Sequence, residues 1–135
     1  MTGRDTVIAT GTYLGATAAE LTRKTGADKI AGGVSQKALF LRRGEISLYA
    51  DRLVLGDWSE AGDLVLRPHD VSAAEVRYTD LYGRFIGGLL NAGKPLIVTV
   101  PEIGDVYLLI DRKEFMETTD DRRWAKLLTE WLTAR

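Results

Sequence analysis

The sequence predicts an α+β domain, built mainly from antiparallel strands and closed by a C-terminal amphipathic helix. In the middle of the chain, apolar residues alternate with polar ones in short segments that end at turn residues, as in half-buried antiparallel strands. Near the C-terminus, apolar residues recur every three or four positions, which is typical of a helix that covers a sheet. The chain has 135 residues, the usual length of one domain, so we expect residues 1–135 to fold as a single unit.

The first part of the chain is interpreted as a lead-in to this domain. Residues 6–14 carry β-branched and aromatic side chains and predict an early strand, which Gly15 is expected to break. Residues 16–24 favour a short helix that ends before a glycine. The domain therefore divides into a lead-in over residues 1–33 and a main body over residues 34–135.

The main body begins with a predicted hairpin. Residues 37–42 form its first strand, Arg43-Gly44 its turn, and residues 45–50 its second strand. The second strand alternates strictly, which predicts one buried face and one wet face. Its inward-facing residues are expected to be Ile46, Leu48 and Ala50.

Three further strands are expected over residues 53–56, 63–67 and 74–78. The polar residues 57–62 between the first two predict a loop. Pro68 should end the strand over residues 63–67, because proline has no N–H group to donate to a neighbouring strand. Residues 95–100 and 105–111 then predict a second hairpin around a turn at residues 101–104.

The last element is an amphipathic helix with one apolar stripe. The stripe consists of Trp124, Leu127, Leu128, Trp131 and Leu132. Thr118 and Asp121 have the spacing of a capping box at its start, and acidic residues there favour the helix dipole. Two tryptophans on one side of the helix must be covered, and the open end of a strand barrel would cover them.

This order of elements resembles the bacterial pleckstrin-homology-like domains. The matching stretches are residues 45–55 (EISLYADRLVL), residues 64–76 (LVLRPHDVSAAEV) and the lead-in residues 11–15 (GTYLG). The resemblance implies an antiparallel β-barrel of about seven strands over residues 34–135, capped by the C-terminal helix. It also implies a bacterial cytoplasmic protein that recognises partners or associates with itself.

Composition excludes several classes of function. The chain has a net charge of −1, which gives no overall attraction to nucleic acid and disfavours a membrane-surface partner. Cysteine is absent, so disulfides, thiolate metal sites and a cysteine nucleophile are excluded. The apolar runs are strand-length and far shorter than the roughly 20 residues of a membrane helix. We expect a cytoplasmic protein without a cofactor.

The motifs that could carry catalysis are incomplete. Residues 88–94 have the spacing of a phosphate-binding loop, but Pro95 replaces the hydroxyl residue that would bind Mg²⁺, and Lys94 leads into a strand instead of a helix. His69 is the sole histidine and is interpreted as a surface turn residue. The acidic residues Asp57, Glu60 and Asp63 lack a calcium-loop pattern. We therefore expect no enzyme activity.

Residues 81–92 predict a loop, because glycines interrupt their helical spacing and each weakens a helix by about 1 kcal/mol. The apolar residues of this loop form either an exposed surface that binds a partner or a cover that completes the core. They are Tyr82, Phe85, Ile86, Leu89 and Leu90. We call them the predicted apolar patch.

A second candidate site is basic. Pleckstrin-homology-like domains that bind phosphoinositides carry basic residues around the first hairpin, where this chain has Lys37, Arg42 and Arg43. Glu45 would offset them, so a solvated hairpin corner is the competing interpretation.

Together these features predict a non-catalytic binding or assembly module. It would dock a protein segment or a second protomer on an unpaired strand edge or on the predicted apolar patch. Two alternatives stay open. One is a small-ligand carrier or enzyme that uses the barrel interior, which the apolar inward residues Ile46, Leu48, Leu53 and Leu55 disfavour. The other is anionic-lipid binding through the first hairpin.

Overall fold

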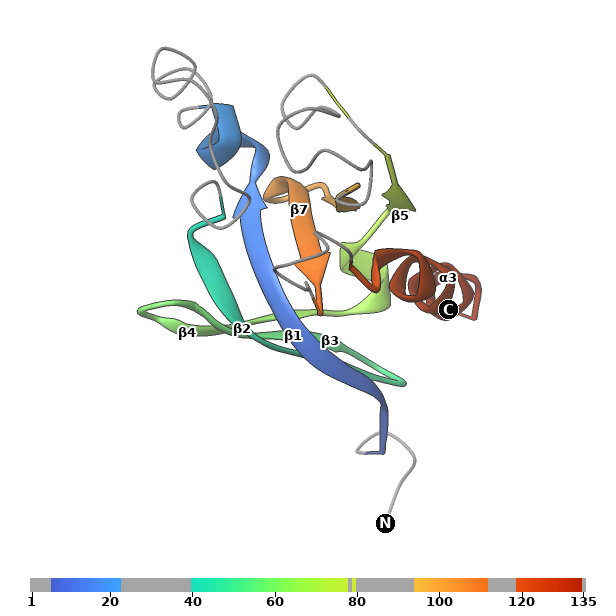
Figure 1. The fold of residues 1–135 in the computed structure, drawn as a ribbon. Coiled ribbons are helices and arrows are strands. Elements are labelled where there is room, and N and C mark those ends of the chain that lie inside the picture. The colour runs from blue at the N-terminus through green and yellow to red at the C-terminus, as the bar shows by residue number, and fades with distance from the viewer. Residues whose placement is uncertain (1–5, 23–39, 78, 80–93, 112–118, 135) are drawn as a thin grey trace.

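Seven strands form one antiparallel sheet in the computed structural model, which describes residues 6–22, 40–77, 79, 94–111 and 119–134. The spatial order is β4-β3-β2-β1-β7-β6-β5. In chain order the strands are β1 (Val7–Thr17), β2 (Arg42–Tyr49), β3 (Leu53–Ser59), β4 (Gly62–Leu66), β5 (Ala73–Val76), β6 (Leu96–Val100) and β7 (Gly104–Ile110). The short helix η3 (Pro68–Asp70) joins β4 to β5, and α3 (Asp121–Thr133) ends the chain (Figure 1).

β1 is the central strand of the sheet. It pairs with β2 along nearly all of its length and with β7 over residues 13–17. The prediction that Gly15 breaks this strand is wrong, because β1 runs through it to Thr17. A Cβ atom at Gly15 would lie 3.1 Å from side-chain atoms of Leu108 and Trp58. The glycine is therefore explained by close packing.

The predicted helix over residues 16–24 begins later than expected. Ala16 and Thr17 belong to β1, and helical structure covers residues 18–22, the last described residues of this segment. Thr17 caps that turn, because its backbone N–H donates to Glu20 Oε1 (2.9 Å) and its Oγ1 accepts from the Glu20 N–H (3.2 Å). This reciprocal pair is a capping box.

The predicted turn at Arg43-Gly44 is wrong. Both residues lie inside β2, opposite Leu14 and Tyr13 of β1. Gly44 is required there by a close backbone approach, since a Cβ atom would collide with the carbonyl oxygen of Gly56 in β3. The predicted strand over residues 37–42 is also wrong. Residues 40 and 41 are not in a strand, and Arg42 is the first residue of β2. Residues 37–39 lie outside the described residues.

Ile46 and Leu48 of β2 are buried as predicted, whereas Ala50 is exposed in the turn that follows. The predicted wet face is wrong at Ser47, which is buried as well. The predicted loop over residues 57–62 is largely wrong. β3 continues through Ser59, and a register shift between Leu55 and Ser59 marks a β-bulge. Asp57 adopts a positive φ of 53° at this bulge.

The later strands agree with the sequence. β4 ends at Leu66, before Pro68; β5 replaces the predicted strand over residues 74–78; and β6 and β7 form the predicted hairpin. The loop predicted over residues 81–92 lies outside the described residues. Within the described residues, no helix has the length and apolarity needed to cross a membrane.

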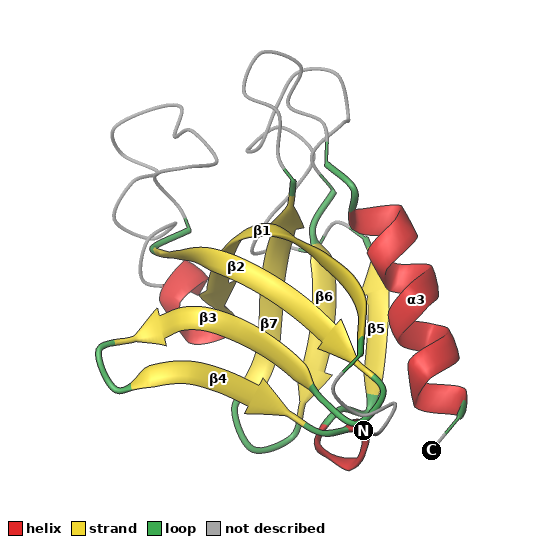
Figure 2. Cartoon of the chain, turned by 90° about the horizontal axis from the view of Figure 1, so that it is seen from below, coloured by secondary structure: helices red, strands yellow, loops and turns green. Residues whose placement is uncertain are grey.

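The curved sheet has apolar clusters on both faces. β3 and β4 cross the direction of β6 and β7 (Figure 2), so residues from both edges of the sheet share one core with α3. A second cluster lies on the opposite face of β6 and β7, under the helical turn after β1, and includes Leu21, Phe40, Ile97 and Leu109. Burial on both faces explains why β6 and β7 read as continuous apolar runs.

The amphipathic helix is confirmed. Its residues Trp124, Leu128 and Trp131 are buried, and Trp131 Nε1 donates a hydrogen bond of 3.1 Å to the carbonyl oxygen of Ala50. The capping prediction is different in detail. Asp120 is the N-cap and makes no side-chain cap bond, Asp121 accepts instead from the Ile110 N–H of β7, and Thr118 lies outside the described residues.

Candidate functional site

The two edges of the sheet differ in how they are covered. α3 packs along β5 at one edge (Figure 2), where Ala74 and Val76 are half-buried while Ala73 and Glu75 stay exposed. β4 forms the other edge, and its extensive contacts within the described chain are with β3 alone. An uncovered edge strand presents unpaired backbone groups to any chain that can pair with it. β4 is therefore the candidate site, and we call its outer side the β4 edge.

The hydrogen-bonding pattern determines which backbone groups face outward. The Tyr49 N–H donates to the Arg52 carbonyl (2.8 Å), so these two residues form a hydrogen-bonded pair at the β2–β3 turn. Antiparallel ladders alternate between bonded and non-bonded pairs. It follows that Leu64 and Leu66 bond to β3, given their register with Leu55 and Leu53. The N–H and C=O groups of Asp63 and Val65 therefore point away from the sheet.

The side chains of the β4 edge also alternate. Leu66 is buried and Leu64 half-buried, whereas Asp63 and Val65 are exposed. Val65 is 44% exposed, one of the large apolar side chains that the described surface presents to solvent. Asp63 Oδ1 accepts from the Asp57 N–H (2.9 Å), which stabilises the bulge of β3 and holds β4 beside it.

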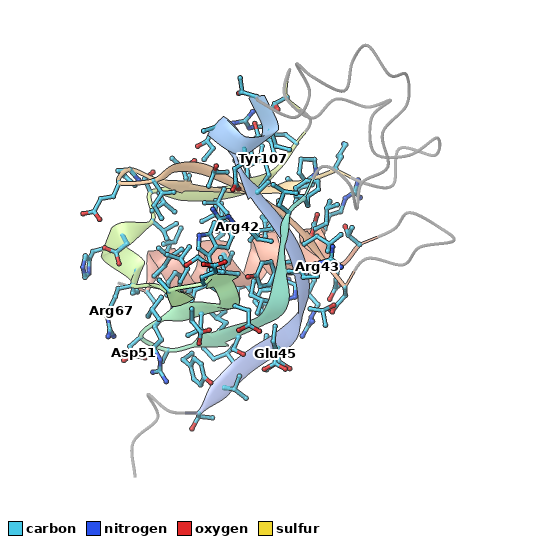
Figure 3. All side chains as sticks on the ribbon, turned by 90° about the vertical axis from the view of Figure 1, so that its left-hand side faces the viewer. Arg42, Arg43, Glu45, Asp51, Arg67 and Tyr107 are labelled. Carbon is cyan, nitrogen blue, oxygen red and sulfur yellow. The ribbon has the colours of Figure 1, made fainter. Side chains whose placement is uncertain are left out.

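The edge ends at a small polar corner. Asp70 accepts from the Arg67 N–H through Oδ2 (2.9 Å) and donates its own N–H to the Arg67 carbonyl (2.9 Å). The Arg67 guanidinium lies 3.3 Å from Asp51 at the same corner (Figure 3). These contacts fix the geometry of residue 67 directly beyond β4. The edge can therefore accept about one short strand before the chain turns away.

The predicted apolar patch is not placed by the structure. Tyr82, Phe85, Ile86, Leu89 and Leu90 lie outside the described residues. The patch stays a prediction.

The predicted basic site is not assembled as expected. Arg42 and Arg43 are neighbours inside β2, so their side chains lie on opposite faces of the sheet (Figure 3). Arg42 donates to both carboxylate oxygens of Glu20, at 3.0 and 2.8 Å, and lies over the Trp58 ring with its Cζ 4.4 Å from the ring centroid. Arg43 is exposed and Lys37 lies outside the described residues.

The interior of the curved sheet is filled by its own side chains. Ile46, Leu53 and Leu55 are fully buried, as the sequence predicts. The Tyr13 hydroxyl donates to the Gly56 carbonyl (2.6 Å). Burial, reinforced by the negative charge of Asp57, raises the pKa of Tyr13 to about 12, so this hydroxyl stays protonated. The Tyr13 hydroxyl therefore has a structural role in joining β1 to β3.

The remaining motif residues are placed as surface or structural groups. His69 is exposed in η3, with Nε2 3.5 Å from Asp70 Oδ1. Lys94 precedes β6, as predicted, while residues 88–93 lie outside the described residues. In the part of the chain that is described, Asp57, Glu60 and Asp63 belong to no group of three or more ligating side chains able to hold a metal ion.

Two features of the structure were missed at the level of sequence. The spacing Thr17-x-x-Glu20 is a capping-box signal and could have located the helical turn. The β4 edge had no such signal, because strand order is set by contacts between distant segments. Neither a protein-family model nor a curated protein matches the sequence of this chain.

Proposed function

We propose that this chain is a non-catalytic binding or assembly module that pairs a strand of another polypeptide with the β4 edge. The observation that carries this proposal is the outward direction of the Asp63 and Val65 backbone groups beside an exposed Val65 side chain. Pairing an added strand there would satisfy these groups and cover apolar surface at once. The contrast with the β5 edge, along which α3 packs, supports a difference in role between the two edges.

The same proposal includes a pleckstrin-homology-like barrel as the frame of the site. Support comes from the shared core, which contains Leu66 from one edge strand and is packed by Val76 from the other. Trp131 of α3 reaches Ala50 at one end of β2, whereas Arg42 and Trp58 meet at the other end. Such a barrel would be plugged at both ends by side chains, which favours surface recognition over a ligand held inside.

The composition fits this role inside a bacterial cell. A chain without cysteine needs no oxidising compartment to fold. With 18 basic and 19 acidic residues, recognition would depend on local pairing and not on a strong overall field. The proposed partner is therefore an extended protein segment.

A proline substitution at position 65 tests the proposal. Val65→Pro removes an N–H group that points away from β3, so it leaves the bonds of the β3–β4 ladder in place. Short random peptides displayed on phage serve as the probe, selected on the parent protein and then measured individually. We expect Val65→Pro to weaken the selected peptides by about tenfold, because one or two hydrogen bonds of about 1 kcal/mol are lost.

Val65→Thr is the matched control, because it keeps the β-branched shape and the N–H group. Peptides should bind this variant nearly as well as the parent, and copies N-methylated at alternate amides should not bind. Equal binding to the parent and to Val65→Pro, with both folded by circular dichroism, would place recognition elsewhere.

A further inference from the structure

We infer that the strand that pairs with the β4 edge is β4 of a second copy, so that two chains form a symmetric dimer with one continuous sheet. This inference rests on the proposed function and names its partner. Residues 63–67 have the sequence Asp-Leu-Val-Leu-Arg, with an acidic and a basic residue at opposite ends of an apolar centre.

Antiparallel self-pairing makes this segment complementary to itself. When Val65 faces Val65 of the second copy, Asp63 lies opposite Arg67, Leu64 opposite Leu66, and the same pairs repeat across the two-fold axis. Opposite charges directly across a pair of strands stabilise it, and so do paired β-branched residues. The segment thus offers two ion pairs around an apolar contact.

Other registers lose this match. Centring the pair on Leu64 would place Asp63 opposite Val65, and centring it on Leu66 would place Val65 opposite Arg67. Either shift leaves charged groups opposite an apolar side chain, and each also puts inward-facing leucines at the axis. The register centred on Val65 is therefore the one that the charges select.

The backbone groups suit the same register. The outward N–H and C=O of Val65 can exchange two hydrogen bonds with Val65 of the second copy. The Asp63 N–H can donate to the Arg67 carbonyl, which already accepts from the Asp70 N–H and retains a second lone pair. The Arg67 N–H keeps its bond to Asp70 Oδ2. No buried donor is left without a partner at the junction.

The charged side chains can reach across the edge. Asp63 uses Oδ1 for the Asp57 N–H, and no described residue bonds its Oδ2. Arg67 is half-exposed, and its contact with Asp51 at 3.3 Å is a surface ion pair that stabilises the chain little. Because a five-residue strand buries less than the roughly 1,200 Å² of a stable interface, the dimer should be weak and dependent on protein concentration.

Disulfide trapping tests the register. Val65→Cys introduces the sole cysteine of the chain, and bonded partners across an antiparallel pair have Cα atoms about 5.5 Å apart, within disulfide range. Ile103→Cys is the matched control, since Ile103 is 40% exposed against 44% for Val65. Under mild oxidation we expect Val65→Cys to form covalent dimers at least tenfold faster than Ile103→Cys. Equal rates would overturn the inference.

A charge exchange provides a second, independent test. Arg67→Glu and Asp63→Arg each place like charges opposite each other in their own dimer, so each should associate about tenfold more weakly than the parent in sedimentation velocity at low salt. Mixed together, the two variants have opposite charges at both positions and should form a heterodimer as strong as the parent dimer. Because Asp63→Arg also loses the bond to the Asp57 N–H, circular dichroism must show that this variant folds. If it does not fold, the double variant Asp63→Asn/Arg67→Glu is used instead. It should associate more strongly than Arg67→Glu alone, because like charges no longer face each other across the pair of strands.

The outcomes separate this inference from the proposed function. A parent protein that stays monomeric, with no preferential trapping at position 65, overturns the dimer. If displayed peptides still bind in a manner sensitive to Val65→Pro, strand addition survives with a different partner. If they do not bind, both proposals fail.

Discussion

Arg42 shows how one side chain can join three segments that lie far apart in the sequence. Its guanidinium donates to Glu20 in the helical turn and to the Trp58 carbonyl in β3, and it also covers the Trp58 ring. Trp58 in turn stacks near Tyr13 of β1. Sequence reasoning assigned Arg42 to a hairpin corner because it took Arg43-Gly44 as a turn, whereas all three residues lie inside β2.

Asp121 is a buried acid at the point where α3 meets the sheet. Its side chain is almost completely buried, and Oδ1 accepts from the Ile110 N–H at 2.7 Å. Oδ2 has no hydrogen-bond partner in the structure. Burial raises the pKa of Asp121 well above its usual 3.8, more than the bond to Ile110 lowers it, and the nearby Asp120 adds to the rise. Folding therefore favours the protonated acid.

This predicts a pH dependence of stability. Between 3.8 and the raised pKa, the folded chain holds a proton that the unfolded chain has released, so the free energy of unfolding falls as pH rises through this window. Asp121→Asn stays neutral and should not show this fall. In urea denaturation at about pH 4, 6 and 8, the advantage of Asp121→Asn over the parent should grow with pH. Glu102→Gln, at the exposed turn between β6 and β7, is the control; parallel curves for Asp121→Asn and the parent would contradict the prediction.

At the scale of elements, the packing of β2 on β3 depends on a glycine. Gly44 lies opposite Tyr13, and its Cα approaches the Gly56 carbonyl so closely that no Cβ fits. Neither partner in this contact is a flexible side chain, so the backbone itself would have to move. Gly11 differs, because its added Cβ would meet the carboxylate of Asp111, at 2.9 Å.

Alanine substitutions at these glycines should therefore differ in cost. Gly44→Ala should destabilise the fold by about 3 kcal/mol, the upper range of overpacking effects. Gly11→Ala should cost about 1–2 kcal/mol, since the Asp111 side chain can turn aside but then loses the bond that its Oδ1 accepts from the Thr12 N–H. Urea denaturation followed by tryptophan fluorescence measures both. Equal costs would show that β2 and β3 can separate without penalty.

The elements that sequence reasoning located well are those with a strong local signal. β6 and β7 were found from apolar runs around a turn, α3 from its apolar stripe, and the end of β4 from Pro68. Two of the errors concern Gly15 and Arg43-Gly44, where a glycine was taken to mark a break. In both places the glycine accommodates a neighbouring strand or side chain, which depends on contacts between segments that the local sequence does not reveal.

At the scale of the whole molecule, the candidate site depends on which strands form the edges of the sheet. The sequence supplied β4 as a strand, and it supplied the idea of an unpaired edge. It could not identify β4 as that edge, because the order β4-β3-β2-β1-β7-β6-β5 pairs β1 with the distant β7 and places the consecutive strands β4 and β5 at opposite edges. Once this order is known, α3 is seen to pack along one edge strand, β5, and to leave the other, β4, without a helix beside it.

The covering of β5 leads to a prediction about the whole fold. Trp124 of α3 is fully buried against the sheet, so Trp124→Ala should lower the free energy of unfolding by about 3–5 kcal/mol and loosen the helix. The uncovered β5 edge should then pair with other molecules and cause aggregation. Trp131→Phe, which loses the bond to Ala50, should give a smaller effect, and Lys126→Ala on the exposed side of α3 should give none. Light scattering and thioflavin fluorescence during mild heating measure this order. If Trp124→Ala is destabilised but remains as dispersed as the parent, α3 stabilises the core without protecting the edge.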